Sequence, residues 1–282
     1  QKLNIVEKTQ DKLLDVLVRK KVAKRFGGRL KAFVSGGAAL NPEIGNFFLS
    51  LGVNILQGYG QTEASPIISC NRPDNIQIET VGPALPGVEI KIAQDGEILV
   101  KGELVMKGYW KDPETTENTI IDGWLHTGDV GIIQDDGCLR ITDRKKDIIV
   151  NSGGDNIAPA RVEGAITLEP EFVQAMVYGD KKPHLVALIV PSDDYVEEWC
   201  KNVGQQKTTK QLSKDEAFCA AAQSILSRVN SRLSQIEKVR HFIVASDPFT
   251  TENGMMTPTL KIRRHRIIEK YKKELEGLYK RS

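Results

Sequence analysis

The stretch Gln57-Gly58-Tyr59-Gly60-Gln61-Thr62-Glu63 decides the fold, because it places two glycines, a hydroxyl and a carboxylate directly after a buried strand. The apolar residues of the run 53–56 predict that strand, and the glycines let the backbone turn sharply and approach a ligand. Thr62 offers a hydroxyl to a phosphate oxygen, and Glu63 offers the hard anionic oxygen that Mg²⁺ prefers. The alternative is a glycine turn with a helix-capping Thr62, and these seven residues alone leave both interpretations open.

A second strand end of similar composition lies upstream. Ala32-Phe33-Val34 predicts a strand that ends in the small-residue loop 35–39, and Asn41 caps a following helix that has Pro42 in its first turn. In open α/β sheets, ligands bind beyond the carboxyl ends of the strands. We therefore expect the loops at Gly36 and Gly58 to face one pocket.

Between residues 82 and 142 the pattern changes to short strands separated by turns, which predicts a small antiparallel barrel or sheet. If Asp135-Asp136-Gly137 is a three-residue hairpin turn, Asp129 lies opposite Asp143 and next to Arg144. A carboxylate beside a guanidinium suits a ribose diol with its neighbouring phosphate. A structural ion pair is the alternative.

Four consecutive charged residues, Arg144-Lys145-Lys146-Asp147, predict a linker because nothing there can be anchored in a core. Beyond them the pattern is that of a compact α+β module. The expected domains are a partial α/β subdomain (1–80), a β subdomain (81–143), a hinge (144–147) and a mobile α+β C-terminal domain (148–282). Lys261 lies in the loop 254–261, just before a basic terminal helix.

The composition of the 282 residues is that of a soluble protein, with 40% hydrophobic and 27% charged residues. We expect a cytoplasmic protein, because no apolar run approaches the roughly 20 residues of a membrane span and the first residues lack a signal-peptide pattern. The four cysteines and four histidines are scattered, so we expect neither disulfides nor a transition metal. Residues 257–282 contain nine Lys/Arg and only three Glu. This predicts a solvated helix or, alternatively, weak peripheral contact with an anionic inner membrane face; we expect no nucleic-acid binding.

Five motifs, in the same order along the chain, closely resemble those of the adenylate-forming (AMP-binding) acyl-CoA synthetases. Their sequences are most similar to those of the bacterial long-chain fatty acyl-CoA synthetases. The motifs are VSGGAAL (34–40), QGYGQTE (57–63), GWLHTGD (123–129), DRKKD (143–147) and TPTLK (257–261). The resemblance implies an α/β remnant of the large N-terminal domain plus a small β-barrel-like subdomain, followed by a separate α+β C-terminal domain. It also implies a chain without the upstream Ser/Thr/Gly-rich loop that holds pyrophosphate.

The resemblance implies a role for each matching residue. Gly36, Gly37 and Ala38 line the adenine and acyl pocket, and Tyr59 packs against adenine in the turn made by Gly58 and Gly60. Thr62 binds the α-phosphate, Glu63 holds Mg²⁺, Asp129 and Arg144 hold the ribose, Lys146 is the hinge, Gly153 borders the pantetheine channel, and Lys261 is the adenylation lysine. Position 150, a lysine in some relatives, is Val150 here.

The implied activity joins a fatty acid to coenzyme A at the expense of ATP, through an acyl-adenylate and with rotation of the C-terminal domain between the two steps. ATP or AMP, Mg²⁺ and coenzyme A are the implied ligands, and the missing N-terminal portion is an implied partner. Two alternatives remain: a non-catalytic module that binds AMP or acyl-adenylate, and a ligase that loads a carrier protein.

Overall fold

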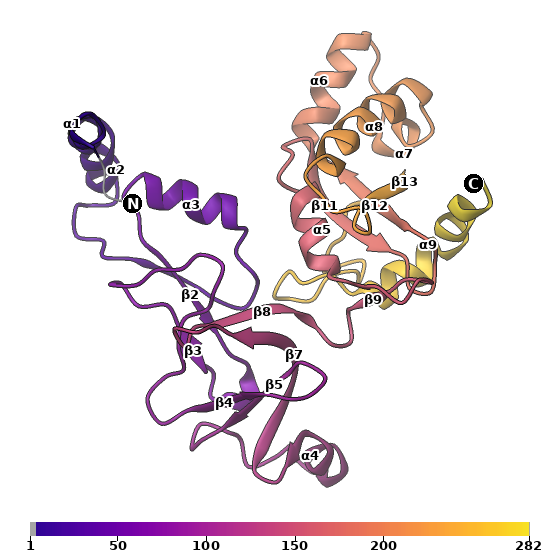
Figure 1. Ribbon diagram of the computed structural model, residues 1–282. Coiled ribbons are helices and arrows are strands. Elements are labelled where there is room, and N and C mark those ends of the chain that lie inside the picture. Colours follow the sequence, from indigo (N-terminus) through magenta and orange to yellow (C-terminus); the bar gives the residue numbers. More distant parts are fainter. Residues whose placement is uncertain (1–3, 282) are drawn as a thin grey trace. The chain divides into compact units, whose positions relative to one another are not determined.

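The computed structural model describes residues 4–281. The chain divides into two compact units, Gln1–Lys146 (unit 1) and Asp147–Ser282 (unit 2), and the colours of Figure 1 follow the chain from unit 1 (indigo to magenta) into unit 2 (towards orange and yellow). The predicted split of the first unit near residue 80 stays a prediction. One buried apolar cluster includes Tyr59 and Ile68 from the first part and Ile98 and Leu125 from the second, so the two parts share a core.

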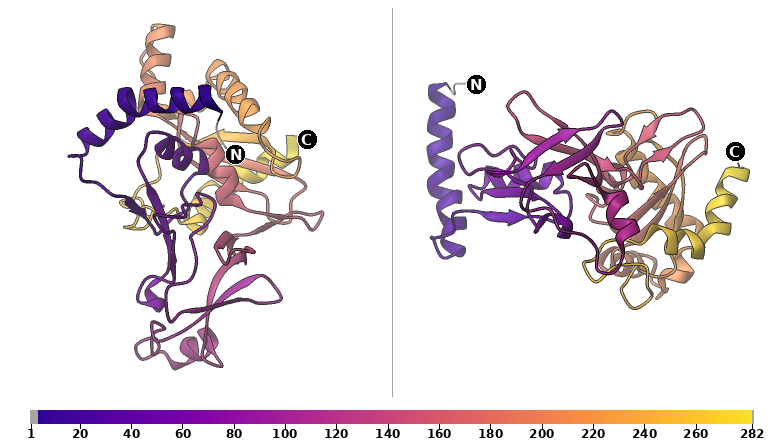
Figure 2. Two further views of the ribbon diagram at one scale, coloured as in Figure 1. Left: turned by 60° about the vertical axis from the view of Figure 1, so that its left-hand side comes forward. Right: turned by 90° about the horizontal axis from the view of Figure 1, so that it is seen from below.

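Unit 1 begins with one long helical rod made of α1 (Ile5–Leu14), a π-helical turn (Asp15–Arg19) and α2 (Lys20–Arg25), as Figure 2 shows. Several of its apolar side chains face solvent; Leu13 is 59% exposed and Leu17 is 50% exposed. Arg19 joins the rod to the next helix, because its Nε donates a hydrogen bond to the Ser50 carbonyl at 3.0 Å.

The strand, loop, helix and strand expected from residues 32–59 are present. Strands β1 (Phe33–Ser35) and β2 (Ile55–Tyr59) are parallel, and β3 (Ser69–Cys70) runs antiparallel to β2. Helix α3 (Pro42–Ser50) begins as predicted: Pro42 lies in its first turn, and the Asn41 side chain accepts a hydrogen bond from the Glu43 N–H at 2.8 Å.

The second part of unit 1 is a five-stranded antiparallel sheet in the order β4-β5-β7-β6, with β8 paired to β7. The strands are β4 (Glu89–Ile92), β5 (Glu97–Lys101), β6 (Ile120–Ile121), β7 (Trp124–Ile133) and β8 (Leu139–Arg144), and α4 (Pro113–Thr119) precedes β6. The sheet is open, so the expected barrel-like closure is wrong. Closure requires the two edge strands of the sheet to pair with each other, and the edge strand β6 has only two residues for such pairing.

The hairpin between β7 and β8 has the predicted turn but a different register. The Gln134 N–H donates to the Cys138 carbonyl at 2.9 Å, which closes the turn 135–137. Further along, Thr142 is an extra residue on β8, so Asp129 pairs with Arg144. The expected pairing of Asp129 with Asp143 is therefore wrong by one residue, because this β-bulge shifts the ladder.

Unit 2 is built around a three-stranded sheet of β11 (Phe172–Tyr178), β12 (Leu185–Pro191) and β13 (Val239–Val244). The central strand β12 is antiparallel to β11, parallel to β13 and buried at every residue. Alternate β12 residues enter two apolar clusters on opposite faces of the sheet. Figure 1 shows α5 (Pro159–Ile166) and α8 (Glu216–Asn230) on one face and α9 (Arg264–Leu278) on the other.

The remaining elements of unit 2 are β9 (Ile149–Val150), β10 (Asn156–Ile157), α6 (Asp193–Val203), α7 (Thr209–Leu212) and a final 3₁₀ turn (Tyr279–Arg281). Helix α9 lays Ile267, Tyr271 and Leu275 on the sheet, which places its many charged residues on the outer side. Among residues 4–281, every helix is too short or too polar to cross a lipid bilayer.

Candidate functional site

Two glycine loops lie side by side at the carboxyl ends of the parallel strands β1 and β2. Ser35 pairs with Gln57, and the Leu40 N–H donates to Gln57 Oε1 at 3.1 Å. A Cβ atom on Gly36 would lie 3.5 Å from the Gly58 carbonyl oxygen. The loops at Gly36 and Gly58 therefore lie next to each other at one edge of the sheet, and that they face one pocket stays a prediction.

The two glycines of the second loop have different roles in the chain. A Cβ on Gly60 would lie 1.8 Å from the Pro66 carbonyl oxygen, so no other residue fits there without moving the backbone. The Ile68 N–H donates to the Tyr59 carbonyl at 2.8 Å and closes the same loop. A Cβ on Gly58 would meet only ordinary contacts, 3.6 Å and longer. Gly60 is thus required by loop closure, whereas Gly58 leaves room beside the strand end.

Tyr59, Asp129 and Arg144 converge at the end of β2. The Tyr59 hydroxyl donates to Asp129 Oδ2 at 2.7 Å, and Arg144 Nε donates to Asp129 Oδ1 at 3.0 Å. Tyr59 and Asp129 are buried, while the Arg144 side chain is 55% exposed. Burial, followed by the charge of Asp129, raises the pKa of the Tyr59 hydroxyl far above its ordinary value. Each carboxylate oxygen has a second lone pair, so Asp129 keeps the capacity to accept from a diol.

A bulge in β7 directs Asp129 toward Tyr59. The register between β5 and β7 shifts so that Thr127-Gly128-Asp129 faces the single residue Ile98. Gly128 has φ +71°, a left-handed conformation that favours glycine. The Thr127 hydroxyl donates to the Ile98 carbonyl at 2.7 Å and accepts from the Asp129 N–H at 3.1 Å. The motif that ends in Thr-Gly-Asp is therefore a bulge that re-aims one carboxylate.

Glu97 supports this bulge from the neighbouring strand β5, and sequence reasoning missed it. Its carboxylate accepts from the Gly128 N–H at 2.8 Å and from Lys145 Nζ at 3.1 Å, and lies 3.2 Å from His126 Nδ1. Burial opposes ionisation, but these partners outweigh it and hold the pKa of Glu97 below its ordinary value. The one available signal was an acidic residue directly before the apolar residues 98–100 of the strand.

Thr62 and Glu63 form the first residues of a short 3₁₀ turn (Thr62–Ala64) beyond the loop. Gln61 occupies the cap position, so the alternative role of Thr62 as a helix cap is not what the structure shows; the Thr62 side chain is exposed. Glu63 is half-buried, and the Tyr109 hydroxyl donates to its Oε1 at 2.8 Å. One carboxylate together with substrate phosphates is a donor set that Mg²⁺ commonly accepts, so Glu63 fits the expected ion. Tyr109 was missed from the sequence.

Lys261 belongs to unit 2 and lies in a closed hairpin. The Thr257 N–H donates to the Lys261 carbonyl at 2.8 Å, and the Lys261 N–H donates to Thr257 Oγ1 at 3.1 Å. Met256 and Ile262 pair across the hairpin base. The turn is made by residues 258–260, and the side chain of Lys261, directly after it, is exposed.

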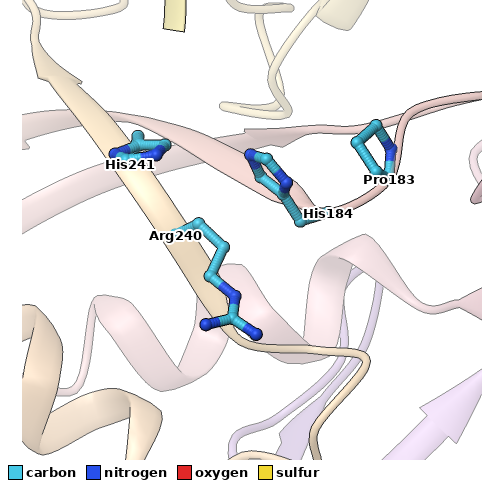
Figure 3. A pocket seen from close by; sticks show the side chains of 4 residues that line it. All are labelled: Pro183, His184, Arg240 and His241. Atoms are coloured by element: carbon cyan, nitrogen blue, oxygen red, sulfur yellow. The ribbon is translucent and has the colours of Figure 1, made fainter. Parts of the chain in front are cut away.

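Gly153 lies in an Asn-stabilised turn beside a groove of unit 2. The Asn151 side chain accepts from the Gly153 N–H and the Asp155 N–H, both at 2.9 Å. The groove extends along the turn to Pro183, His184 and Arg240. Figure 3 shows these three residues with His241 around an adjoining hollow. Burial, then the nearby His241 and Arg240, lower the pKa of His184, which favours its neutral form.

Comparison with known proteins identifies the class. The AMP-binding enzyme model matches residues 4–110, and the model of the AMP-binding enzyme C-terminal domain matches residues 146–282. The chain belongs to the AMP-binding enzyme family.

Among enzymes of this family, the chain is similar to long-chain fatty-acid–CoA ligases. The chain is 36% identical over 277 residues to the long-chain-fatty-acid–CoA ligase FadD15 of Mycobacterium bovis, covering 96% of this chain and 45% of that protein. It is 34% identical to the human long-chain-fatty-acid–CoA ligase 6, covering 95% of this chain and 41% of that one. The chain thus spans less than half the length of these ligases.

Solved structures of adenylation domains have the same fold. The adenylation domain of a Mycobacterium chelonae carboxylate reductase matches with a TM-score of 0.75 and 30% identity, covering 93% of this chain and 41% of that one. The A domain of a carboxylic acid reductase from Segniliparus rugosus, in complex with AMP and a co-purified carboxylic acid, matches with a TM-score of 0.74 and 26% identity, covering all of this chain and 43% of that one.

Proposed function

We propose that this chain acts in the ATP-dependent ligation of a long-chain fatty acid to coenzyme A. In the first step a carboxylate oxygen attacks the α-phosphorus of ATP, which gives an acyl-adenylate and pyrophosphate. In the second step the thiol of coenzyme A attacks the acyl carbon, which gives the thioester and AMP and releases the thiol proton. The long-chain ligases among its relatives support this choice of substrates.

The convergence of Tyr59, Asp129 and Arg144 beside the glycine loops carries the proposal. A buried carboxylate that still has lone pairs can accept both hydroxyls of a ribose, and Arg144 supplies a cation for the adjacent oxygens. The Tyr59 ring lies at the strand end, where adenine would pack. Thr62 would bind the α-phosphate, and Glu63 would hold Mg²⁺, which supplies charge neutralisation at the phosphates when bound.

Nucleotide binding tests this assignment directly. Asp129→Asn keeps the size of the side chain and removes its charge, so AMP affinity measured by calorimetry should fall about 10- to 100-fold, the value of one hydrogen bond to a charged group. Asp135→Asn is the matched control, because it makes the same change in the exposed turn at the other end of the same hairpin. Equal AMP affinity in both variants would exclude Asp129 from the nucleotide site.

Lys261 is proposed to neutralise charge on the α-phosphate in the first step only. Lys261→Ala should therefore abolish ATP–pyrophosphate exchange in the full-length protein and spare thioester formation from pre-made acyl-adenylate. Survival of the exchange reaction in this variant would show that the lysine has another role.

The second step would use the groove beside Gly153. Lys238 and Arg240 line it and supply cations suited to the phosphates of coenzyme A, and Gly153 leaves space for the narrow pantetheine arm. A carrier protein presents the same pantetheine thiol without the nucleotide phosphates. Arg240→Ala should thus raise the KM for coenzyme A. If the wild-type enzyme transfers the acyl group to a carrier protein and not to coenzyme A, the carrier-loading alternative replaces coenzyme A ligation.

Lys146 is proposed as the hinge on which Lys261 and Gly153 alternate. Lys145 is anchored in unit 1, because its Nζ binds Asp95 at 2.6 Å and Glu97 at 3.1 Å. Asp147 already belongs to unit 2, where it lies 4.0 Å from Arg264. Fixed neighbours on both sides concentrate the backbone rotation at one exposed residue.

A partner polypeptide is proposed to cover the exposed apolar side chains between Leu13 and Phe47. Val34 is 68% exposed and Phe47 is 59% exposed, and among the described residues β1 pairs only with β2. The occupant that fits is the portion of the longer relatives that this chain does not match. Val34→Asp should prevent its association in a pull-down, whereas Ile121→Asp on the antiparallel sheet should not. Retained association of the Val34 variant would refute this surface.

A non-catalytic module that binds AMP is the remaining alternative. It predicts AMP binding with the Asp129 dependence described above but no exchange or thioester activity, with or without the partner polypeptide. Cytoplasmic location and contact of the basic helix α9 with a membrane face stay predictions.

A further inference from the structure

A buried carboxylate in unit 2 is bound by an arginine that lies close to Lys261 in the sequence. Glu163 of α5 is 9% exposed. Arg264 donates to both of its oxygens, from Nη1 to Oε1 and from Nη2 to Oε2, each at 2.6 Å. The Val177 N–H of β11 also donates to Oε1, at 2.8 Å. This two-pronged geometry fixes the guanidinium in position and in orientation.

Arg264 connects that carboxylate to the Lys261 hairpin. It is the first residue of α9 and lies three residues after Lys261. The Arg263 N–H between them donates to the carbonyl of the buried Met255 at 2.7 Å, so the backbone between Lys261 and α9 is anchored to a buried residue. Three residues span about 10 Å at most. Any movement of the Arg264 backbone is therefore passed on to Lys261.

The packing of α9 does not itself require this ion pair. Its apolar face, which includes Ile267, Tyr271 and Leu275, is already buried against the sheet. Buried ion pairs usually contribute little to net stability compared with apolar residues of similar size. What the pair supplies beyond stability is a fixed direction for the first turn of α9 and for the hairpin before it.

We propose that Glu163 is a positioning residue: through Arg264, its carboxylate holds the Lys261 hairpin in the orientation from which the amine reaches the α-phosphate. This rests on the proposed function of Lys261. Arg264 Nε also lies 4.0 Å from Asp147, the residue after the proposed hinge. The same guanidinium thus links α5, the start of unit 2 and the Lys261 hairpin. We expect these three segments to move as one rigid body when unit 2 rotates.

The matched control is a second buried glutamate of the same unit. Glu169 is 7% exposed and binds Arg228 and Arg232, near the end of α8, with no part in the Lys261 hairpin. Glu163→Gln and Glu169→Gln each leave one side-chain oxygen as an acceptor and remove one buried charge from an arginine pair. Both should lower the melting temperature of unit 2, so loss of stability is common to the two variants.

Two readouts separate positioning from stability. Amide hydrogen exchange of the full-length protein should quicken about tenfold or more at Thr257 and Lys261 in Glu163→Gln only, as expected for local opening of that segment. In ATP–pyrophosphate exchange, Glu163→Gln should lower kcat by about 100-fold, the order expected for a 1 Å misplacement, with the KM for ATP unchanged. Glu169→Gln should leave kcat unchanged.

The outcomes also separate this inference from the proposed function. If the amide hydrogen-exchange rates of Thr257 and Lys261 are the same in both variants, Glu163 does not position the hairpin and the inference is overturned. If protection falls in Glu163→Gln but kcat does not, positioning has no catalytic consequence and the inference is equally overturned. If Lys261→Ala itself leaves pyrophosphate exchange intact, the proposed role of Lys261 fails whatever Glu163 does.

Discussion

Replacing Tyr59 by Phe removes a single hydroxyl from the group formed by Tyr59, Asp129 and Arg144 in unit 1. That hydroxyl donates to Asp129 Oδ2 at 2.7 Å, and both side chains are buried. Because burial and the charge of Asp129 raise the pKa of Tyr59, the hydroxyl keeps its proton, and remains a donor, at any pH at which the protein is handled. The variant leaves Asp129 with Arg144 on Oδ1 and without a protein donor from Tyr59 on Oδ2.

The structure sets the size of the effect. A hydrogen bond to a charged group contributes about 1.5–3 kcal/mol, and the buried position of this one places the expected loss for unit 1 at about 2 kcal/mol. Tyr109→Phe is the matched control, since its hydroxyl also donates to a carboxylate, Glu63 Oε1, at 2.8 Å. Tyr109 and Glu63 are both only half-buried, so that loss should stay below about 1 kcal/mol.

The assay must report on unit 1 alone, because tryptophans occur in both units. Hydrogen exchange at increasing urea, followed in the peptides that contain β2 and β7, gives the free energy of unfolding of that unit. AMP affinity measured beside it should stay within about threefold of wild type, since the ring that would pack on adenine is kept. Equal destabilisation by the two Tyr-to-Phe changes, or none by Tyr59→Phe, would refute the reasoning.

Three further predictions concern other parts of the chain. Gly60→Ala should prevent stable folding of unit 1, because its Cβ would lie 1.8 Å from the Pro66 carbonyl, whereas Gly58→Ala should cost about 1 kcal/mol or less by urea unfolding. Because the pKa of Glu97 is lower in the folded protein, its contribution to stability is present above about pH 4.5 and is lost as the pH falls through the folded value; Glu97→Gln should flatten this part of the stability profile. Lys146→Pro should trap one arrangement of the units and reduce one half-reaction far more than the other, so equal loss of both would argue against a hinge there.

Much of the local structure could be predicted from the sequence because it depends on neighbouring residues. Asn41 with Pro42 fixes the start of α3, and the turn at 135–137 closes as its Asp-Asp-Gly composition indicates. The apolar run of β12 predicts a strand covered on both faces. Pairing over longer distances was harder, and the expected barrel is an open sheet because β6 is too short to continue it.

The site shows where reasoning from the sequence reaches its limit. Spacing alone placed Asp129 opposite Asp143, because a regular ladder has no extra residue. In the structure, Thr142 is an extra residue on β8, which makes a first bulge, and Gly128 lies in a second bulge on β7. The first bulge sets Arg144 opposite Asp129, and the second turns the same carboxylate toward Tyr59. The glycine at position 128 is a sign of the second bulge, but the sequence does not show its partner Glu97 on another strand, and Thr142 gives no comparable sign of the first. Two irregularities in the ladder therefore bring together three side chains that are 85 residues apart at their extremes, and a regular sheet from the same residues would have separated them.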